Sequence, residues 1–188
     1  MNRCWTAFLL LLVAAPPLLA KATLTAPVLT LDGNQLAATF RLEAAFDDEL
    51  VRRIESGLPS GFEFKFKLVR TRARWFDNTL QETDLQVLAM YNAVNREYLV
   101  NYKQNGKLTG SRMVGDLEDL ESAMTQFENI VVFDLDQSPG EQPPIDHHLI
   151  VRLRAVLGSH NILAFIPTKT TSEWVESRVV EKPQPADR

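Results

Sequence analysis

The middle of the chain, from Gly61 to Phe76, alternates apolar and polar residues with a period of two. This period is typical of a β-strand that buries one of its faces. The apolar face begins with four residues: Phe62, Phe64, Phe66 and Leu68. The same parity then carries three arginines: Arg70, Arg72 and Arg74. The pattern therefore predicts one strand whose inward face is apolar at its start and basic at its end.

A second alternating segment follows Asp77-Asn78-Thr79, where Asn tolerates the left-handed conformation that a tight turn needs. A turn about Asn78 would place charge opposite charge and apolar opposite apolar. The expected pairs are Arg74–Glu82, Arg72–Asp84, Arg70–Gln86, Leu68–Leu88 and Phe66–Met90. Because cross-strand pairs of this kind stabilise a sheet, the sequence predicts one long, twisted hairpin.

Shorter strand patterns lie on both sides of this hairpin. The expected strands cover residues 28–31, 35–43, 96–104, 107–114, 130–135, 145–157 and 162–166. Asp32-Gly33-Asn34 and Asn105-Gly106 are tight-turn signals that join two pairs of neighbouring strands. Polar segments over 137–144 and 168–177 separate or follow the last strands, and the second of them contains Trp174.

Two segments have helical spacing instead. The first has Asp47 or Asp48 as its N-cap and ends near Gly57 and Pro59. Its apolar residues are Leu50, Val51, Ile54 and Leu58. The second begins after Asp116, and its apolar stripe is Leu117, Leu120, Met124 and Phe127. The whole pattern predicts an α+β protein that is mainly antiparallel β, a twisted meander or sandwich-like sheet with two short helices.

The first 22 residues have a different character. Arg3 precedes an apolar run over residues 8–15, and Ala20-Lys21-Ala22 has the small residues that a signal peptidase reads. We therefore expect a secretory signal peptide over residues 1–22, cleavage before Thr23 and a periplasmic location in a bacterial envelope. The alternative is a retained membrane anchor, but the run is short for a bilayer and is followed by two prolines.

The remaining chain is expected to form a single β-rich domain over residues 23–180, followed by a disordered tail over 181–188. The one cysteine, Cys4, would leave with the signal, so the mature chain would contain no thiol and no disulfide. Removal of Arg3 and Lys21 would leave 18 basic and 24 acidic residues, which changes the formal charge from −4 to −6. An acidic exported protein is a poor candidate for nucleic acid or anionic lipid.

Few residues are candidates for catalysis or metal binding. His147 and His148 are adjacent in an expected strand, so their side chains would point to opposite faces and would not share one ion. Asp134, Asp136 and Asp146 are the carboxylates that a histidine-dependent hydrolase would use, and the first two are also possible calcium ligands. Pairing within the fold or contact with solvent explains all of these residues more simply. We expect no catalytic residue, no metal and no cofactor.

Aromatic and basic residues near the expected turn are better candidates for binding. Trp75 and Phe76 adjoin the turn, where an exposed ring often marks a contact surface. Arginine side chains suit carboxylates and phosphates, although the expected register already gives the arginines acidic partners. Packing within the core is the alternative for the aromatic residues. The candidate binding residues are Trp75, Phe76, Arg70, Arg72, Arg74 and Trp174.

Several stretches of the sequence resemble an uncharacterised family of exported proteobacterial proteins, a domain of unknown function (DUF4390-like). They are residues 57–66, 70–77 and 91–100, the helical segment 117–123 and the closing segments 165–167 and 173–177. Glu173 departs from the family pattern, which has Asp before the tryptophan. The family brings no established catalytic residues. Its genes often lie near those of membrane sensor kinases of the nitrogen-regulation type, which implies a periplasmic accessory or sensing role.

The sequence favours a non-catalytic periplasmic binding or adaptor domain, accessory to a membrane sensor kinase. Its partner would be a protein in the periplasm or inner membrane, with no nucleic acid and no direct membrane anchor after cleavage. The alternatives are a periplasmic hydrolase with a His/Asp site and a structural envelope component. Binding requires an exposed aromatic residue at the hairpin tip, whereas hydrolysis requires a histidine and a carboxylate that meet in a cleft.

Overall fold

The computed structural model describes residues 22–72, 76–137, 148–158 and 170–179. The strands are β1 (Thr23–Leu24), β2 (Val28–Asp32), β3 (Gln35–Glu43), β4 (Ser60–Arg70), β5 (Asn78–Asn92), β6 (Glu97–Gln104), β7 (Lys107–Val114), β8 (Gln126–Asp134), β9 (Leu149–Leu157), β10 (Thr170–Thr171) and β11 (Val175–Arg178). The helices are α1 (Asp48–Glu55), α2 (Leu117–Thr125) and the short 3-10 helix η1 (Leu135–Gln137). This mainly antiparallel β structure with two short α-helices confirms the expected fold class.

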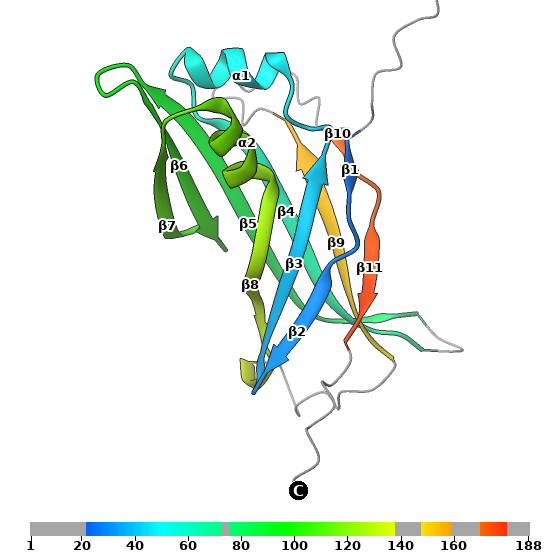
Figure 1. Ribbon diagram of the computed structural model, residues 1–188. Coiled ribbons are helices and arrows are strands. Elements are labelled where there is room, and N and C mark those ends of the chain that lie inside the picture. Colours follow the sequence, from blue (N-terminus) through cyan, green and yellow to red (C-terminus); the bar gives the residue numbers. More distant parts are fainter. Residues whose placement is uncertain (1–21, 73–75, 138–147, 159–169, 180–188) are drawn as a thin grey trace, which may run out of the picture.

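The strands form two sheets, one in front of the other (Figure 1). The large sheet has the order β10-β9-β4-β5-β6-β7, and β11 also pairs with β9. The small sheet is built on β3, which pairs with β1 and β2 along one edge and with β8 along the other. Helices α1 and α2 lie together at one end of the molecule, where α1 contacts β4 and β5 and α2 contacts β6 and β8.

Four phenylalanine rings form the centre of the core between the sheets. Phe40 and Phe127 come from the small sheet, and Phe64 and Phe66 come from the large sheet. The Phe40 ring centroid lies 4.7 Å from that of Phe127, 5.1 Å from that of Phe64 and 5.4 Å from that of Phe66. The alternation in β4 therefore buries the face that the sequence predicted, while Glu63, Lys65 and Lys67 on the other face stay partly exposed.

The β4–β5 hairpin forms, but the expected register is wrong. Phe66 pairs with Thr83 instead of Met90, and Leu68 pairs with Gln81 instead of Leu88. For both of these residues the expected partner lies seven residues farther along β5 than the observed one. Asn78 is consequently the first residue of β5, and the connection between the two strands covers residues 71–77.

The register differs because β5 carries apolar residues on both of its faces. Its buried face consists of Thr83, Leu85, Val87 and Ala89, whereas Leu88 and Met90 lie on the partly exposed face. An odd shift in register moves every side chain to the other face, so the two solutions exclude each other. Glu82 and Asp84 lie opposite Lys67 and Lys65, not opposite Arg74 and Arg72. Lysines of β4 thus supply the charge pairing that the arginines were expected to supply, and Lys67 Nζ lies 2.7 Å from Glu82 Oε1.

Helix α1 has Asp47 as its N-cap, so the structure decides between the two residues that the sequence allowed. The Asp47 carboxylate accepts a hydrogen bond from the backbone N–H of Leu50 at 2.8 Å. Leu50 and Ile54 are buried, while Leu58 lies beyond the helix and is exposed. The cap fixes the first turn of the helix at the end of the molecule where α1 contacts β4 and β5.

Replacement of Asp47 by alanine is expected to lower the free energy of unfolding by about 1 kcal/mol, because the first turn loses its side-chain acceptor. Asp48→Ala is the matched control, since Asp48 is exposed and does not cap the helix. We expect this control to change the free energy by no more than about 0.5 kcal/mol. Chemical denaturation of the two variants measures the difference, and equal losses would contradict the assigned cap.

Other expected elements differ from the structure near the ends of the helices and strands. Helix α2 has Asp116 as its N-cap, as expected, but it ends at Thr125. Phe127 therefore belongs to β8, where it stacks on Phe40, and not to the helical stripe. The segment around Trp174, expected to be irregular, contains β10 and β11. The signal peptide and the tail, together with the strand over 162–166, lie outside the described residues apart from Ala22.

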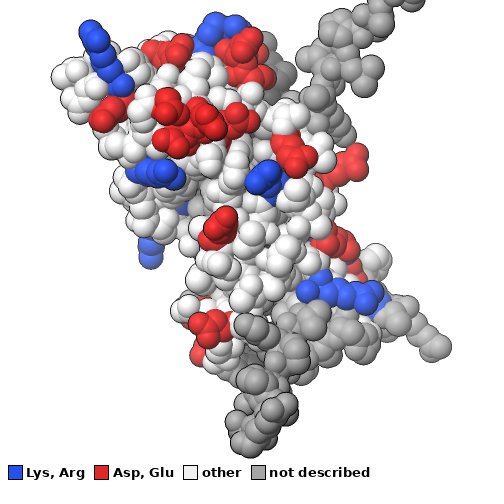
Figure 2. Space-filling model, in the orientation of Figure 1, with Lys and Arg blue, Asp and Glu red and all other residues white. Residues whose placement is uncertain are grey.

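Acidic side chains gather over α1 and α2 on the face shown in Figure 2. The exposed acids of these helices are Asp48, Glu49, Glu55, Glu118, Asp119 and Glu121. Neither helix in the described part of the chain has the length and apolar character needed to cross a membrane. The helices that carry these acidic residues lie at the opposite end of the molecule from the tip of the β4–β5 hairpin (Figure 1).

Candidate binding surface

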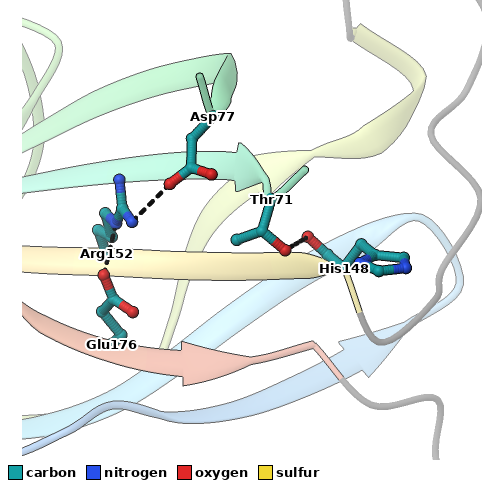
Figure 3. A network of polar contacts seen from close by, with 5 residues as sticks. All are labelled: Thr71, Asp77, His148, Arg152 and Glu176. Carbon is teal, nitrogen blue, oxygen red and sulfur yellow. Dashed lines mark hydrogen bonds and ion pairs between the residues drawn. The ribbon is translucent and has the colours of Figure 1, made fainter. Parts of the chain in front are cut away.

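A network of ion pairs fixes the base of the β4–β5 hairpin tip (Figure 3). Arg152, in β9, donates from Nη2 to Asp77 Oδ2 at 2.8 Å and from Nε to Glu176 Oε1 at 2.6 Å. Asp77 directly precedes β5, and Glu176 lies in β11. Although partial burial alone would lower the pKa of Arg152, its hydrogen bonds to Glu176 and Asp77 raise the pKa above its ordinary value. One guanidinium group thus links three segments that are far apart in the sequence.

A second contact holds the other side of the tip. Thr71, the first residue after β4, donates from its backbone N–H to the carbonyl oxygen of His148 at 2.8 Å. Its hydroxyl group donates to the same oxygen at 3.2 Å. Because Thr71 and Asp77 lie at the two ends of the connection, both of its ends are anchored to β9 or to the residue before it (Figure 3).

Phe76 lies on this anchored tip and is 95% exposed. The connection that carries Phe76 continues past the start of β9, because Arg70, the last residue of β4, pairs with Leu149, the first residue of β9 (Figure 1). Arg72 is also exposed. Arg74 and Trp75 were predicted to share this surface, and both lie outside the described residues. The structure therefore decides between the exposed and the core-packed alternative for Phe76, in favour of exposure.

Arg70, at the end of β4, is partly buried. It lies opposite Asn78 of β5 and Leu149 of β9, on the same side of β4 as the buried Leu68. Two of its guanidinium nitrogens, Nε and Nη2, are buried and have no hydrogen-bond partner in the described part of the chain. The expected pairing of Arg70 with Gln86 is thus wrong.

Trp174 lies away from the tip, on the face of the large sheet that points away from the small sheet. Its ring centroid is 4.5 Å from the guanidinium carbon of Arg154 and 5.8 Å from Lys67 Nζ. Each such cation–π contact contributes about 0.5–1 kcal/mol at an exposed site. Lys67 pairs with Arg152 across the β4–β9 ladder, so Trp174 occupies the same face as the Arg152 network.

Two of the candidate catalytic carboxylates, Asp134 and Asp136, lie at the end of β8 and in η1. The Asn34 side-chain amide lies 2.8 Å from both carboxylate oxygens of Asp136, and Asp134 Oδ1 accepts from the Asp136 backbone N–H at 3.1 Å. His147 and Asp146 lie outside the described residues. Within the described ranges, no group of three or more His, Cys, Asp or Glu side chains is placed to hold a metal ion.

A cleft of about 530 Å³ lies between β5, the β6–β7 turn and β8. Gln104 and Gln81 cross it and donate to the backbone carbonyls of Val131 and Asp134, each at 2.9 Å. The described residues that line this cleft include no histidine. Its chemistry therefore differs from the histidine–carboxylate cleft that the hydrolase alternative requires.

Sequence reasoning missed the residues that anchor the tip. Arg152 alternates with apolar residues in β9, which marks it only as a residue of the exposed face. Its partners are 75 residues away at Asp77 and 24 residues away at Glu176. Because no local pattern links such distant residues, only the arrangement of the strands reveals the network.

The comparisons with known proteins identify a family but no function. No curated protein and no solved structure matches the chain. The sequence profile of a family described as a domain of unknown function (DUF4390) matches residues 20–160, well over half of the chain. The chain belongs to the DUF4390 family.

Proposed function

We propose that this protein is an exported, non-catalytic binding domain that holds a protein partner with the tip of its β4–β5 hairpin. The observation that carries the proposal is the 95% exposure of Phe76 on a projecting tip. Aromatic side chains supply a large share of binding energy at protein interfaces when a partner buries them.

The anchoring of the tip supports the same function. Arg152 and Thr71 hold the two ends of the connection before any partner arrives. A contact segment whose two ends are already fixed loses less conformational entropy on binding than one whose ends move freely. The ion pairs themselves contribute little to the stability of the fold, because Arg152 and its two partners are substantially exposed to solvent.

The proposed place of action is the periplasm, after cleavage of the signal peptide expected over residues 1–22. Strand β1 begins at Thr23, the residue that follows the expected cleavage site, and pairs with β3. Cleavage before Thr23 would leave β1 and its pairing with β3 intact, so the proposed processing is compatible with this sheet. The proposed partner is a protein of the inner membrane or periplasm, and an accessory role beside a membrane sensor kinase fits the resemblance. Within the described residues, no comparable observation favours a hydrolase.

Crosslinking in intact cells tests the contact. A photoreactive amino acid at position 78, an exposed residue at the start of β5, is expected to form an adduct with one protein that mass spectrometry identifies. Phe76→Ser is expected to weaken this capture strongly, since loss of an aromatic anchor lowers affinity about 30-fold.

Val94→Ser is the matched control. Val94 is 90% exposed on the β5–β6 turn, and its replacement removes a similar exposed apolar side chain from the other end of β5. We expect the adduct to remain in this variant. An adduct that is equally strong in Phe76→Ser, or that is lost equally in both variants, would contradict the proposed contact.

A further inference from the structure

Arg70 differs from the other arginines with buried nitrogens in the described part of the chain. Arg53 and Arg154 each have one buried, unpaired nitrogen, whereas Arg70 has two. Arg53 also lies 4.0 Å from Glu49, and Arg154 stacks on Trp174. Arg70 makes neither kind of contact with any described residue. Nε and Nη2 of Arg70 are therefore buried without an acceptor among the described residues.

The fold gives no structural reason for this arrangement. Buried polar groups normally have hydrogen-bond partners, and an unpaired charged donor destabilises the free protein. Arg152, on the neighbouring strand, shows the ordinary solution, because two carboxylates engage its guanidinium. Groups that break such local rules without compensation are characteristic of functional sites.

We infer that Arg70 receives a carboxylate side chain of the protein partner that the hairpin tip holds. This inference rests on the proposed function and names the chemistry of the partner. The guanidinium group of arginine binds a carboxylate by donating two parallel hydrogen bonds to its oxygens. The neighbours Leu68 and Leu149 are fully buried and apolar, so the site suits a group with a single charge better than a doubly charged phosphate.

The charge distribution supports an acidic partner segment. Among the described residues of the tip, Arg72 is exposed without an ion pair, and Asp77 is already engaged by Arg152. Glu82 and Glu176 also lie near the tip but pair with Lys67 and Arg152. Other exposed acids gather at the far end, over α1 and α2 (Figure 2). An acidic segment would be attracted to the tip and repelled from the opposite end, which orients its approach.

Titration of the purified protein with defined probes tests the inference. The probes are a peptide of alternating Glu and Ser, the matching Gln–Ser peptide and inorganic phosphate, with affinity measured by calorimetry at low and high salt. We expect the Glu–Ser peptide to bind most tightly and its affinity to fall with salt. Binding of phosphate in preference to the Glu–Ser peptide, or no detectable binding of that peptide, would overturn the carboxylate assignment.

Three variants locate the binding group. Arg70→Met is expected to weaken binding of the Glu–Ser peptide about tenfold or more, as expected for loss of a charge-assisted pair. Arg70→Lys keeps the charge but loses the fork, and we expect an intermediate affinity. Arg112→Met, at an exposed position of β7, is the control and is expected to change the affinity less than about twofold. Equal effects of Arg70→Met and Arg112→Met would show that only net charge matters.

Stability separates a binding role from a structural one. Because Arg70→Met removes two unpaired donors and keeps an apolar stem, its midpoint of urea denaturation is expected to equal or exceed that of the wild type. A clear decrease in the midpoint would show that Arg70 supports the fold and would overturn the inference.

The proposed function and this inference can fail separately. If the adduct in cells depends on Phe76 but persists in Arg70→Met, and the peptide affinity of this variant is unchanged, the carboxylate inference is wrong and the proposed function stands. If the peptide binds through Arg70 but the adduct does not depend on Phe76, the proposed contact through the tip is wrong and the carboxylate site stands.

Discussion

Phe64→Ala is expected to lower the free energy of unfolding by about 3–5 kcal/mol. The Phe64 side chain is fully buried, and its ring centroid lies 5.1 Å from that of Phe40 and 5.0 Å from that of Phe127. Truncation removes the contact between the two sheets at its centre. Backbone ladders on both sides of the site hold the strands in place, so the surrounding structure has little freedom to close the cavity.

Chemical denaturation of Phe64→Ala measures this loss, and Phe76→Ala is the matched control. The same substitution at Phe76 removes a ring that is 95% exposed, so we expect a change within about 0.5 kcal/mol. The contrast tests the division of the phenylalanines into core and contact residues. Similar losses in the two variants would mean that the sheets do not meet at the aromatic cluster.

Gly61→Ala is expected to lower the free energy of unfolding by about 3 kcal/mol, although alanine is normally the better residue in a strand. A Cβ atom at Gly61 would lie 1.9 Å from the backbone carbonyl oxygen of Val87. Since the obstruction is backbone and not the end of a flexible side chain, β4 and β5 would have to move apart. Such a shift disturbs the ladder that joins the two longest strands of the large sheet.

Gly110→Ala provides the control within the same sheet. A Cβ atom there would lie 3.8 Å from Tyr102 Cδ2, which is an ordinary van der Waals distance. We expect no loss of stability beyond about 0.5 kcal/mol in thermal or chemical denaturation. A well-tolerated Gly61→Ala would show that β4 and β5 are farther apart at this point than described.

Local patterns in the sequence were sufficient for most of the elements. The alternation in β4 predicted which of its faces is buried, because the two faces differ in polarity. Asn105-Gly106 predicted the β6–β7 hairpin, and both residues have the positive φ angles, 49° and 76°, that this turn requires. Asp116 predicted the start of α2 through its capping side chain.

Local patterns could not predict the register of β4 with β5 or the pairing of strands far apart in the sequence. Strand β5 has apolar residues on both faces, so two incompatible pairings with β4 both matched apolar to apolar. Strands β10 and β11 contain two and four residues, too few for a periodic signal, and they form because β9 offers them an edge. The sequence therefore predicted the hairpin and an exposed tip, but not the residues that lie opposite one another.

For the candidate binding residues, too, local properties were predictable from the sequence and long-range contacts were not. Exposure of Phe76 followed from its position beside a turn, which is a local property. The two unpaired nitrogens of Arg70 could not be foreseen, because the expected register gave Arg70 a polar partner. Trp174 is also a predicted binding residue, and the contacts of its ring with the cations Arg154 and Lys67 had no local signal in the sequence.

The pairing of β11 with β9 determines where the protein can be truncated or tagged. Six of the nine residues of β9 are buried, and the strand is rich in branched aliphatic residues. A chain cut before Val175 would leave this strand with an open edge, ready to pair with another molecule. Affinity tags and fusion partners therefore belong after Val179, where they leave the protective strand intact and keep the protein from aggregating.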